Sequence, residues 1–234
     1  MADLARFKNR AQAGKLLAAG LGAKEVDALH RPGTVVLGLP RGGVPVAFAV
    51  AMALGLELDV LLVRKLGMPG QSEFAIGAIG SGGVQVLQPG VPGLMGVTQA
   101  QVDAIAAREL AEIVRREHLY RKERPEPALA GRDVILVDDG IATGSTMLAA
   151  VQVARGRGAA RVVVAVPVAP PDTLAALAPL VDGLVCLAAP LRFRAVSQWY
   201  DSFDQTSDEE VQDLLAMAWR RQAIAGSTPN PKER

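Results

Sequence analysis

The chain has 234 residues, half of them hydrophobic, and a formal net charge of +1. This length fits one domain, or a domain with a small attachment, and the apolar share is enough for a substantial buried core. The charges are spread along the chain and form no one-sided basic run, so the composition gives no sign of a nucleic-acid-binding surface.

One cysteine and two histidines limit the chemistry open to the chain. Cys186 lies in an apolar run, which favours a core position over a catalytic thiol, and this inventory cannot supply the ligands of a structural zinc site. The first residues lack the pattern of a signal peptide, and the longest nearly uncharged run, residues 44–56, is too short to span a bilayer. We therefore expect a cytoplasmic protein without membrane association.

The N-terminal part alternates helical patterns with short apolar runs. The first pattern predicts an amphipathic helix with Leu16 and Leu17 inward and Arg6, Lys8 and Arg10 towards solvent. A strand rich in β-branched residues then ends in the turn Pro40-Arg41-Gly42-Gly43. The expected elements are a helix over residues 5–21, a strand over 34–39, a helix over 44–54 and a strand over 58–63.

Glycines interrupt residues 66–93 and prevent a helix there. We expect a mobile loop over residues 66–83 and a hairpin, with short strands at 75–76 and 84–87. Thr98 then caps a long helix that ends near Lys122, before two prolines.

The C-terminal part continues the alternation and predicts an α/β fold around a parallel sheet. Ser207-Asp208-Glu209-Glu210 has the form of a capping box and opens the last helix. The polar residues 226–234 are expected to be disordered. The expected elements are strands over 134–137, 161–168 and 184–187, and helices over 145–155, 171–180 and 208–223.

The loop after the strand at 134–137 carries the most chemistry. Backbone N–H groups at a helix N-terminus bind anions, and the hydroxyls of Thr143, Ser145 and Thr146 add donors. The carboxylates of Asp138 and Asp139 accept hydrogen bonds, which suits the hydroxyls of a sugar. The pattern therefore predicts a site for a ribose 5-phosphate. Its sequence is Asp138-Asp139-Gly140-Ile141-Ala142-Thr143-Gly144-Ser145-Thr146.

Other loops with acidic or phosphate-binding residues fit this segment less well. Two aspartates after a strand can cap a helix, or bind metal as in phosphorylated receivers, but the further partners of a receiver site are missing from the sequence. A P-loop requires Gly-Lys before its Ser or Thr, whereas this loop reads Gly144-Ser145-Thr146. The glycine fingerprint of dinucleotide-binding folds is also absent.

Residues 134–146 resemble the motif with which type I phosphoribosyltransferases bind 5-phosphoribosyl-1-pyrophosphate (PRPP). Two further segments fit the same family. The turn Pro40-Arg41-Gly42-Gly43 resembles its pyrophosphate loop, and Arg64-Lys65 resembles the start of the flexible loop in the adenine and orotate enzymes. The likeness covers residues 34–187, and the whole chain resembles a bacterial subgroup whose base substrate is poorly defined.

The resemblance implies a parallel-sheet, Rossmann-like α/β core with helices on both faces, a flexible loop or hairpin and a small hood. One domain would span residues 1–225, with its core at 34–187 and its hood built from the N-terminal segment and residues 188–225. It further implies an enzyme of nucleotide salvage that transfers the phosphoribosyl group of PRPP to a nitrogen base, such as a purine or pyrimidine, and releases pyrophosphate. Homodimers are common in the family.

The resemblance also implies roles for single residues. The loop from Asp138 to Thr146 would bind the ribose and the 5-phosphate, and Mg²⁺ would be held mainly through PRPP without a direct protein ligand. The catalytic group would comprise Asp138, Asp139, Arg41 and Lys65, with Glu73 as a candidate for proton transfer or else an ordinary exposed glutamate. Pyrophosphate would be bound by Arg41, Gly42, Gly43, Arg64 and Lys65.

Residues 191–203 gather four aromatic side chains, Phe193, Trp199, Tyr200 and Phe203. Trp199, Tyr200 and Phe203 are candidates for stacking on the base, and the alternative is that they pack the terminal segment onto the domain. The competing function is a PRPP-binding regulator with little or no catalysis. The intact Arg41, Arg64 and Lys65 favour the enzyme, since a sensor needs the pyrophosphate groups less strictly.

Overall fold

A computed structural model describes residues 6–29, 33–88 and 90–226. Its centre is a sheet of five parallel strands in the order β2-β1-β6-β7-β8. The expected α/β fold with a parallel sheet is confirmed. The strands are β1 (Val35–Gly38), β2 (Glu57–Val60), β6 (Asp133–Val137), β7 (Arg161–Val168) and β8 (Gly183–Ala188).

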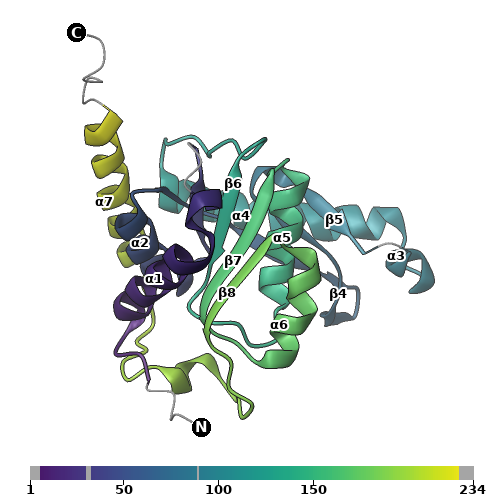
Figure 1. Cartoon of the computed structure of the whole chain (residues 1–234). Helices are drawn as coiled ribbons and strands as arrows, with labels where there is room; N and C mark the ends of the chain where they lie inside the picture. The colour runs from purple at the N-terminus through teal and green to yellow at the C-terminus, as the bar shows by residue number, and fades with distance from the viewer. Residues whose placement is uncertain (1–5, 30–32, 89, 227–234) are drawn as a thin grey trace.

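Helices cover both faces of this sheet (Figure 1). On one face lie α1 (Arg10–Leu29), α2 (Gly43–Leu54) and α7 (Asp208–Gly226), and on the other lie α5 (Ser145–Gly156) and α6 (Pro171–Leu177). Neighbouring strand residues point to opposite faces, so Val36 and Ile135 join one buried cluster while Leu37 and Leu136 join the other. Two apolar layers thus hold the sheet in place.

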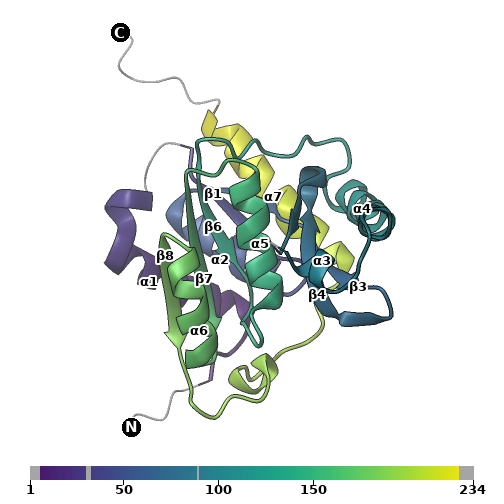
Figure 2. The same cartoon turned by 90° about the vertical axis from the view of Figure 1, so that its right-hand side faces the viewer.

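A second, antiparallel sheet lies beside α5 (Figure 2). It consists of β3 (Val63–Met68), β4 (Gln71–Gly80) and β5 (Gln85–Leu87), and is followed by α3 (Val91–Leu94) and α4 (Gln99–Arg121). The predicted strand over 58–63 is therefore wrong in its end, because β2 stops at Val60 and Val63 opens the hairpin.

The expected loop over residues 66–83 is also corrected, because it forms most of this hairpin. Leu66, Ile76, Ala78 and Ile79 are buried, which gives the segment an apolar side that packs on the core. Glycine content alone suggested a loop, whereas the ladder between β3 and β4 and the burial of these apolar side chains stabilise strands. The short helix α3 was not predicted.

The first helix differs from its prediction at its start and in its orientation. It begins at Arg10 rather than at residue 5, and its side chain Leu17 is fully buried whereas Leu16 is 46% exposed. Arg10 points into the molecule instead of towards solvent. Both errors follow from placing the inward face by sequence pattern without knowing what the helix packs on.

The two predicted helix caps are present. Thr98 Oγ1 accepts a hydrogen bond from Gln101 N, and the Gln101 side chain accepts one from Thr98 N, which completes a capping box on α4. Ser207 Oγ accepts a hydrogen bond from Glu210 N at 3.1 Å at the start of α7. That helix continues to Gly226, and residues 227–234 of the expected tail lie outside the described chain.

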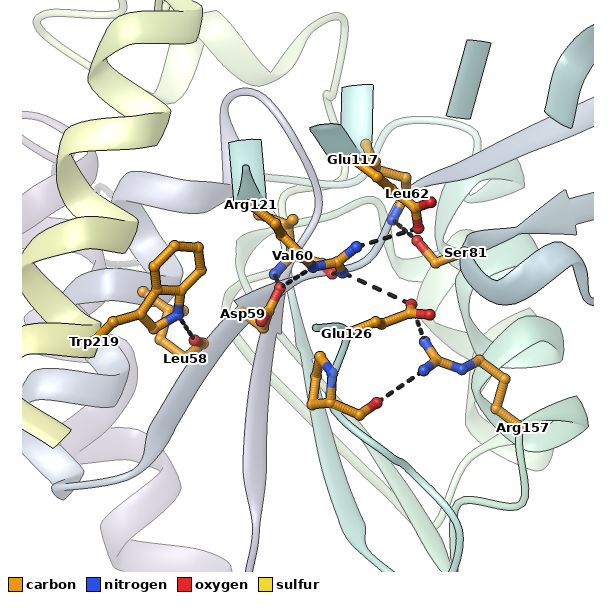
Figure 3. A network of polar contacts seen from close by, with 11 residues as sticks. Leu58, Asp59, Val60, Leu62, Ser81, Glu117, Arg121, Glu126, Arg157 and Trp219 are labelled. Atoms are coloured by element: carbon orange, nitrogen blue, oxygen red, sulfur yellow. Dashed lines mark hydrogen bonds and ion pairs between the residues drawn. The ribbon is translucent and has the colours of Figure 1, made fainter. Parts of the chain in front are cut away.

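A buried polar network joins α4 to the end of β2 (Figure 3). Arg121 Nε donates to Asp59 Oδ1 at 2.8 Å, and its Nη2 donates to Val60 O at 2.7 Å. Glu126 bridges Arg121 and Arg157, which extends the network to the end of α5. Burial raises the pKa of Asp59, while the Arg121 guanidinium opposes that shift. The network thus holds the end of α4 against β2, and α4 in turn packs on β3 and β4 of the hairpin.

No helix in the described ranges is both long enough and apolar enough to cross a membrane.

Candidate functional site

Two of the predicted loops meet where β1 and β6 end. These strands are neighbours, paired in parallel with Gly38 opposite Val137, so the loops that follow them leave the same edge of the sheet. A Cβ atom at Gly42 would collide with the Asp139 carboxylate. One at Gly43 would lie 2.8 Å from Val137 O and 2.9 Å from Asp138 Oδ1. Glycine at both positions therefore lets the turn at residues 40–43 pack directly on the acidic pair.

The rest of the acidic loop leads into α5. Gly144 has a φ of 78° at the helix N-cap, in the left-handed region that favours glycine. The hydroxyls of Thr143 and Ser145 lie 3.2 Å apart, and Thr143 and Thr146 are exposed. The helix start thus presents backbone N–H groups and hydroxyls at the surface, which is the arrangement that binds a phosphate.

The two carboxylates have different partners. Asp139 Oδ2 accepts a hydrogen bond from Arg10 Nε at 2.8 Å, in an ion pair whose side chains are 12% and 14% exposed. Asp138 Oδ1 accepts one from the backbone of Asp139 at 2.8 Å. Burial, together with the charge of Asp139, raises the pKa of Asp138 well above its ordinary value. Burial also raises the pKa of Asp139, and the Arg10 guanidinium opposes this.

Arg10 is the residue of this site that the sequence reading missed. It is the first residue of α1, and its guanidinium reaches two distant parts of the chain. Besides Asp139 it contacts Asp204 O, to which Nη1 donates at 2.7 Å, and the ring of Phe203, whose centroid lies 3.9 Å from Cζ. No local sequence signal marks this role, because the contact to Asp139 spans 129 positions.

Of the predicted base-stacking residues, Phe203 lies against Arg10 and Tyr200 is buried beside Phe203. The Tyr200 ring is 3% exposed and packs between Phe7 and Phe203, at centroid distances of 5.5 and 5.0 Å. Its hydroxyl donates to Asp139 O at 2.6 Å. This packing favours the alternative for Tyr200, namely that it packs the terminal segment onto the domain. Stacking stays a prediction for Trp199 and Phe203, both half-buried.

A third region adds positive charge beside Thr146. Arg64 lies in β3 and its Nε pairs with Glu109 Oε2 of α4 at 2.8 Å, while Lys65 is exposed. Both line an open cavity of about 780 Å³ between the hairpin, α4 and α5. Polar groups in its wall besides these two are Gln101, Arg108, Glu109 and Thr146.

The remaining predicted residues are placed as follows. A small cleft lined by Pro40, Arg64, Arg116 and Thr146 connects the turn after β1 with the hairpin and the phosphate loop. Arg41 is half-buried in that turn, and the peptide bond between Pro40 and Arg41 is cis. The backbone of Glu73 belongs to β4, and its side chain lies outside the described part of the structure.

The fold and these loops define the class of protein to which the chain belongs. A parallel α/β sheet whose glycine-rich and acidic loops meet at the carboxyl edge of adjacent strands is an architecture that binds phosphorylated ligands at that edge. The family is then fixed by comparison. Residues 9–184 match the model of the phosphoribosyl transferase domain, and the chain belongs to that family.

The chain is also similar to relatives of known sequence and of known structure. A protein of Mycobacterium tuberculosis described as "Putative phosphoribosyl transferase Rv0571c" is 49% identical over 221 residues, which cover 94% of this chain and 49% of the relative. The chain thus spans about half the length of the curated relatives it matches. The crystal structure of TT1426 from Thermus thermophilus is 47% identical, covers 91% of this chain and 98% of that one, and superposes with a TM-score of 0.81.

Proposed function

We propose that the chain is a phosphoribosyltransferase that binds PRPP with Mg²⁺, transfers the 5-phosphoribosyl group to a nitrogen base and releases pyrophosphate. The observation that carries this proposal is the packing of Gly42 and Gly43 against Asp138 and Asp139. It brings the predicted pyrophosphate loop within contact distance of the predicted ribose and phosphate loop, as a single molecule of PRPP requires. We propose that the acceptor base is a purine or a pyrimidine.

The proposed division of labour follows from the chemistry of each group. Hydroxyls and backbone N–H groups at the start of α5 would hold the 5-phosphate, and the acidic pair would accept hydrogen bonds from the ribose. Arg41, Arg64 and Lys65 would face the pyrophosphate, whose charge grows as the C1–O bond breaks and the new C1–N bond forms. Positioning and electrostatic stabilisation would supply most of the rate acceleration.

The acidic pair is suited to a ligand that brings its own cation. No group of three or more His, Cys, Asp and Glu side chains in the described ranges is arranged as a metal cage, and one oxygen of Asp139 is bound to Arg10. As the family resemblance implies, Mg²⁺ would be held mainly through the oxygens of PRPP, where it offsets the negative charge of the leaving pyrophosphate. The protein would position Mg²⁺ indirectly, by binding the PRPP that coordinates it.

Further proposals concern the whole protein. We propose one domain over residues 1–225, with a hood formed by the N-terminal segment and residues 188–225, in a cytoplasmic enzyme of nucleotide salvage whose partners are PRPP and the base. A homodimer is the proposed assembly. The contact of Arg10 in the N-terminal segment with Phe203 and Asp204 supports the two-part hood.

The test is incubation with Mg²⁺ and PRPP and a panel of purines, pyrimidines and other nitrogen acceptors, with release of pyrophosphate as the readout. We expect release that depends on one acceptor class. Tight binding of PRPP without acceptor-dependent release would contradict the enzyme and support the alternative, a PRPP-binding regulator. Omission of each reactant in turn controls for spontaneous hydrolysis of PRPP.

A further inference from the structure

The contacts of Arg10 join the acidic loop to the hood. Its Nε binds the Asp139 carboxylate, its Nη1 binds the backbone of Asp204, and its plane lies on the Phe203 ring. The ion pair is largely shielded from solvent, so it is worth more than an exposed pair of the same geometry. Two segments far apart in the sequence, the acidic loop and residues 203–204, therefore converge on one guanidinium of α1.

Two further contacts hold the same unit together. Tyr200 OH donates a hydrogen bond to Asp139 O. The hood thus binds the backbone of Asp139, while Arg10 binds its side chain. A Cβ atom at Gly42 would lie 3.3 Å from Arg10 Nη2 as well as in collision with the Asp139 carboxylate. The turn after β1 thus closes the other side. Asp139 is fixed by α1, by the hood and by the glycine turn.

Asp138 is in a different position. It accepts the backbone N–H of Asp139, and in the described part of the chain no salt bridge reaches it. Two adjacent carboxylates in a partly buried loop repel each other, and Arg10 neutralises one of the two charges. The charge of Asp139 is then balanced by Arg10 inside the protein, and the charge of Asp138 is left for a ligand.

We propose that Arg10 is a positioning residue: it binds Asp139 as an internal brace between the hood and the acidic loop, and so leaves Asp138 as the carboxylate that accepts hydrogen bonds from the sugar hydroxyls of the ligand. This inference rests on the proposed function and assigns unequal roles to two aspartates that the family motif treats as a pair. It also makes the folding of the hood part of the formation of the site.

Three variants test the proposal: Arg10→Gln, Arg10→Lys and the control Arg132→Gln. Arg132 Nη2 pairs with Glu57 Oε2 at 2.6 Å, at the opposite edge of the sheet, with side chains that are 22% and 30% exposed. Calorimetric titration with ribose 5-phosphate and with Mg²⁺-PRPP measures the site. Hydrogen exchange of the amides of residues 196–204 measures the hood.

We expect Arg10→Gln to weaken the binding of ribose 5-phosphate by about ten- to one-hundred-fold, the effect of losing a charge-assisted hydrogen bond. Its hood amides should exchange faster. Arg10→Lys keeps the charge beside Asp139 but loses the planar fork, so affinity should largely recover while the hood still exchanges faster than in the wild type. Arg132→Gln should change neither readout.

The outcomes separate the two proposals. If wild-type protein binds neither ligand, the proposed function fails, and with it the role assigned to Asp138. If the wild type binds and a folded Arg10→Gln variant binds equally well, the positioning role is overturned while the proposed function stands. If Arg10→Gln does not fold, Arg10→Lys decides: wild-type affinity with faster hood exchange supports the proposal, and no change in exchange overturns it.

Discussion

Asp138 and Asp139 are adjacent in the chain, yet their surroundings give them different chemistry. Asp139 is paired with Arg10, whereas Asp138 contacts a backbone N–H and feels the negative charge of its neighbour. Burial and that charge raise the pKa of Asp138 well above its ordinary value. A raised pKa means that a fraction of Asp138 is protonated at pH values where an exposed aspartate is fully ionised.

The pH dependence of ligand binding should reveal this difference. If the Asp138 carboxylate accepts hydrogen bonds from the ribose, its protonated form binds less well. Affinity for ribose 5-phosphate should therefore rise as pH increases from about 4 through the raised pKa of Asp138, and level off above it. Calorimetry across this pH range measures the effect.

The control for this experiment is Asp138→Asn, which cannot titrate. The phosphate of the ligand has its own second pKa of about 6 and gives both proteins a common step. The wild type should show an additional dependence that the variant lacks. Superimposable pH profiles of the two proteins would contradict the assigned role of Asp138.

At the level of elements, the site depends on the close approach of the turn at residues 40–43 to the acidic loop. A methyl group at Gly43 would lie 2.8 Å from the backbone oxygen of Val137, so Gly43→Ala must push the two apart. We expect a loss of about 1–3 kcal/mol in the free energy of unfolding, as for overpacked sites, and at least tenfold weaker binding of PRPP. Urea denaturation and calorimetry measure the two effects.

Gly93→Ala is the matched control for that substitution. A Cβ atom at Gly93 in α3 would meet nothing within 4 Å, and its φ is not in the left-handed region. Stability should stay within about 0.5 kcal/mol of the wild type, with PRPP affinity unchanged. Equal effects of the two substitutions would mean that the contact at Gly43 is not what holds the loops in register.

The polar network between α4 and β2 makes a separate prediction about stability. Arg121→Met would leave Asp59 buried without its cation, and one oxygen of Asp59 has no hydrogen-bond partner among the described residues even with Arg121 present. We expect a loss of about 3–5 kcal/mol in the free energy of unfolding, as for other broken buried pairs. Arg115→Met, which breaks a pair whose arginine is 60% exposed, should leave the stability almost unchanged, because water screens the pair. Similar costs would argue against the network as the anchor of α4.

Elements with a strong local pattern could be predicted from the sequence, and those defined by distant contacts could not. The apolar, β-branched run at residues 161–168 became β7 with the expected bounds, and Thr98 capped α4 as its pattern indicates. The hairpin was harder, because Gly67, Gly77 and Gly80 interrupt the apolar pattern of β3 and β4. Glycine at Gly77 and Gly80 is instead needed there for packing, since a Cβ would collide with β5 and with Val153.

At the scale of the whole molecule, the candidate site is assembled from segments that no local pattern connects. The acidic loop and the glycine turn were predicted, because each follows a buried strand and strand order brings their ends together. Arg10 was not, because its partner lies 129 positions away and its own helix pattern placed it towards solvent. The family model matches residues 9–184, so Phe203 and Asp204, which Arg10 contacts, lie beyond the matched region.

The most direct test of the account is the affinity of Mg²⁺-PRPP for wild-type protein and for Asp138→Asn, measured by calorimetry on samples whose circular dichroism spectra agree. We expect saturable binding of one PRPP per chain by the wild type, and binding at least about tenfold weaker in the variant, since a hydrogen bond to a charged group is worth about 1.5–3 kcal/mol. Absence of binding by the wild type, or equal affinities in the two proteins, would contradict the claim that the loop from Asp138 to Thr146 is the donor site.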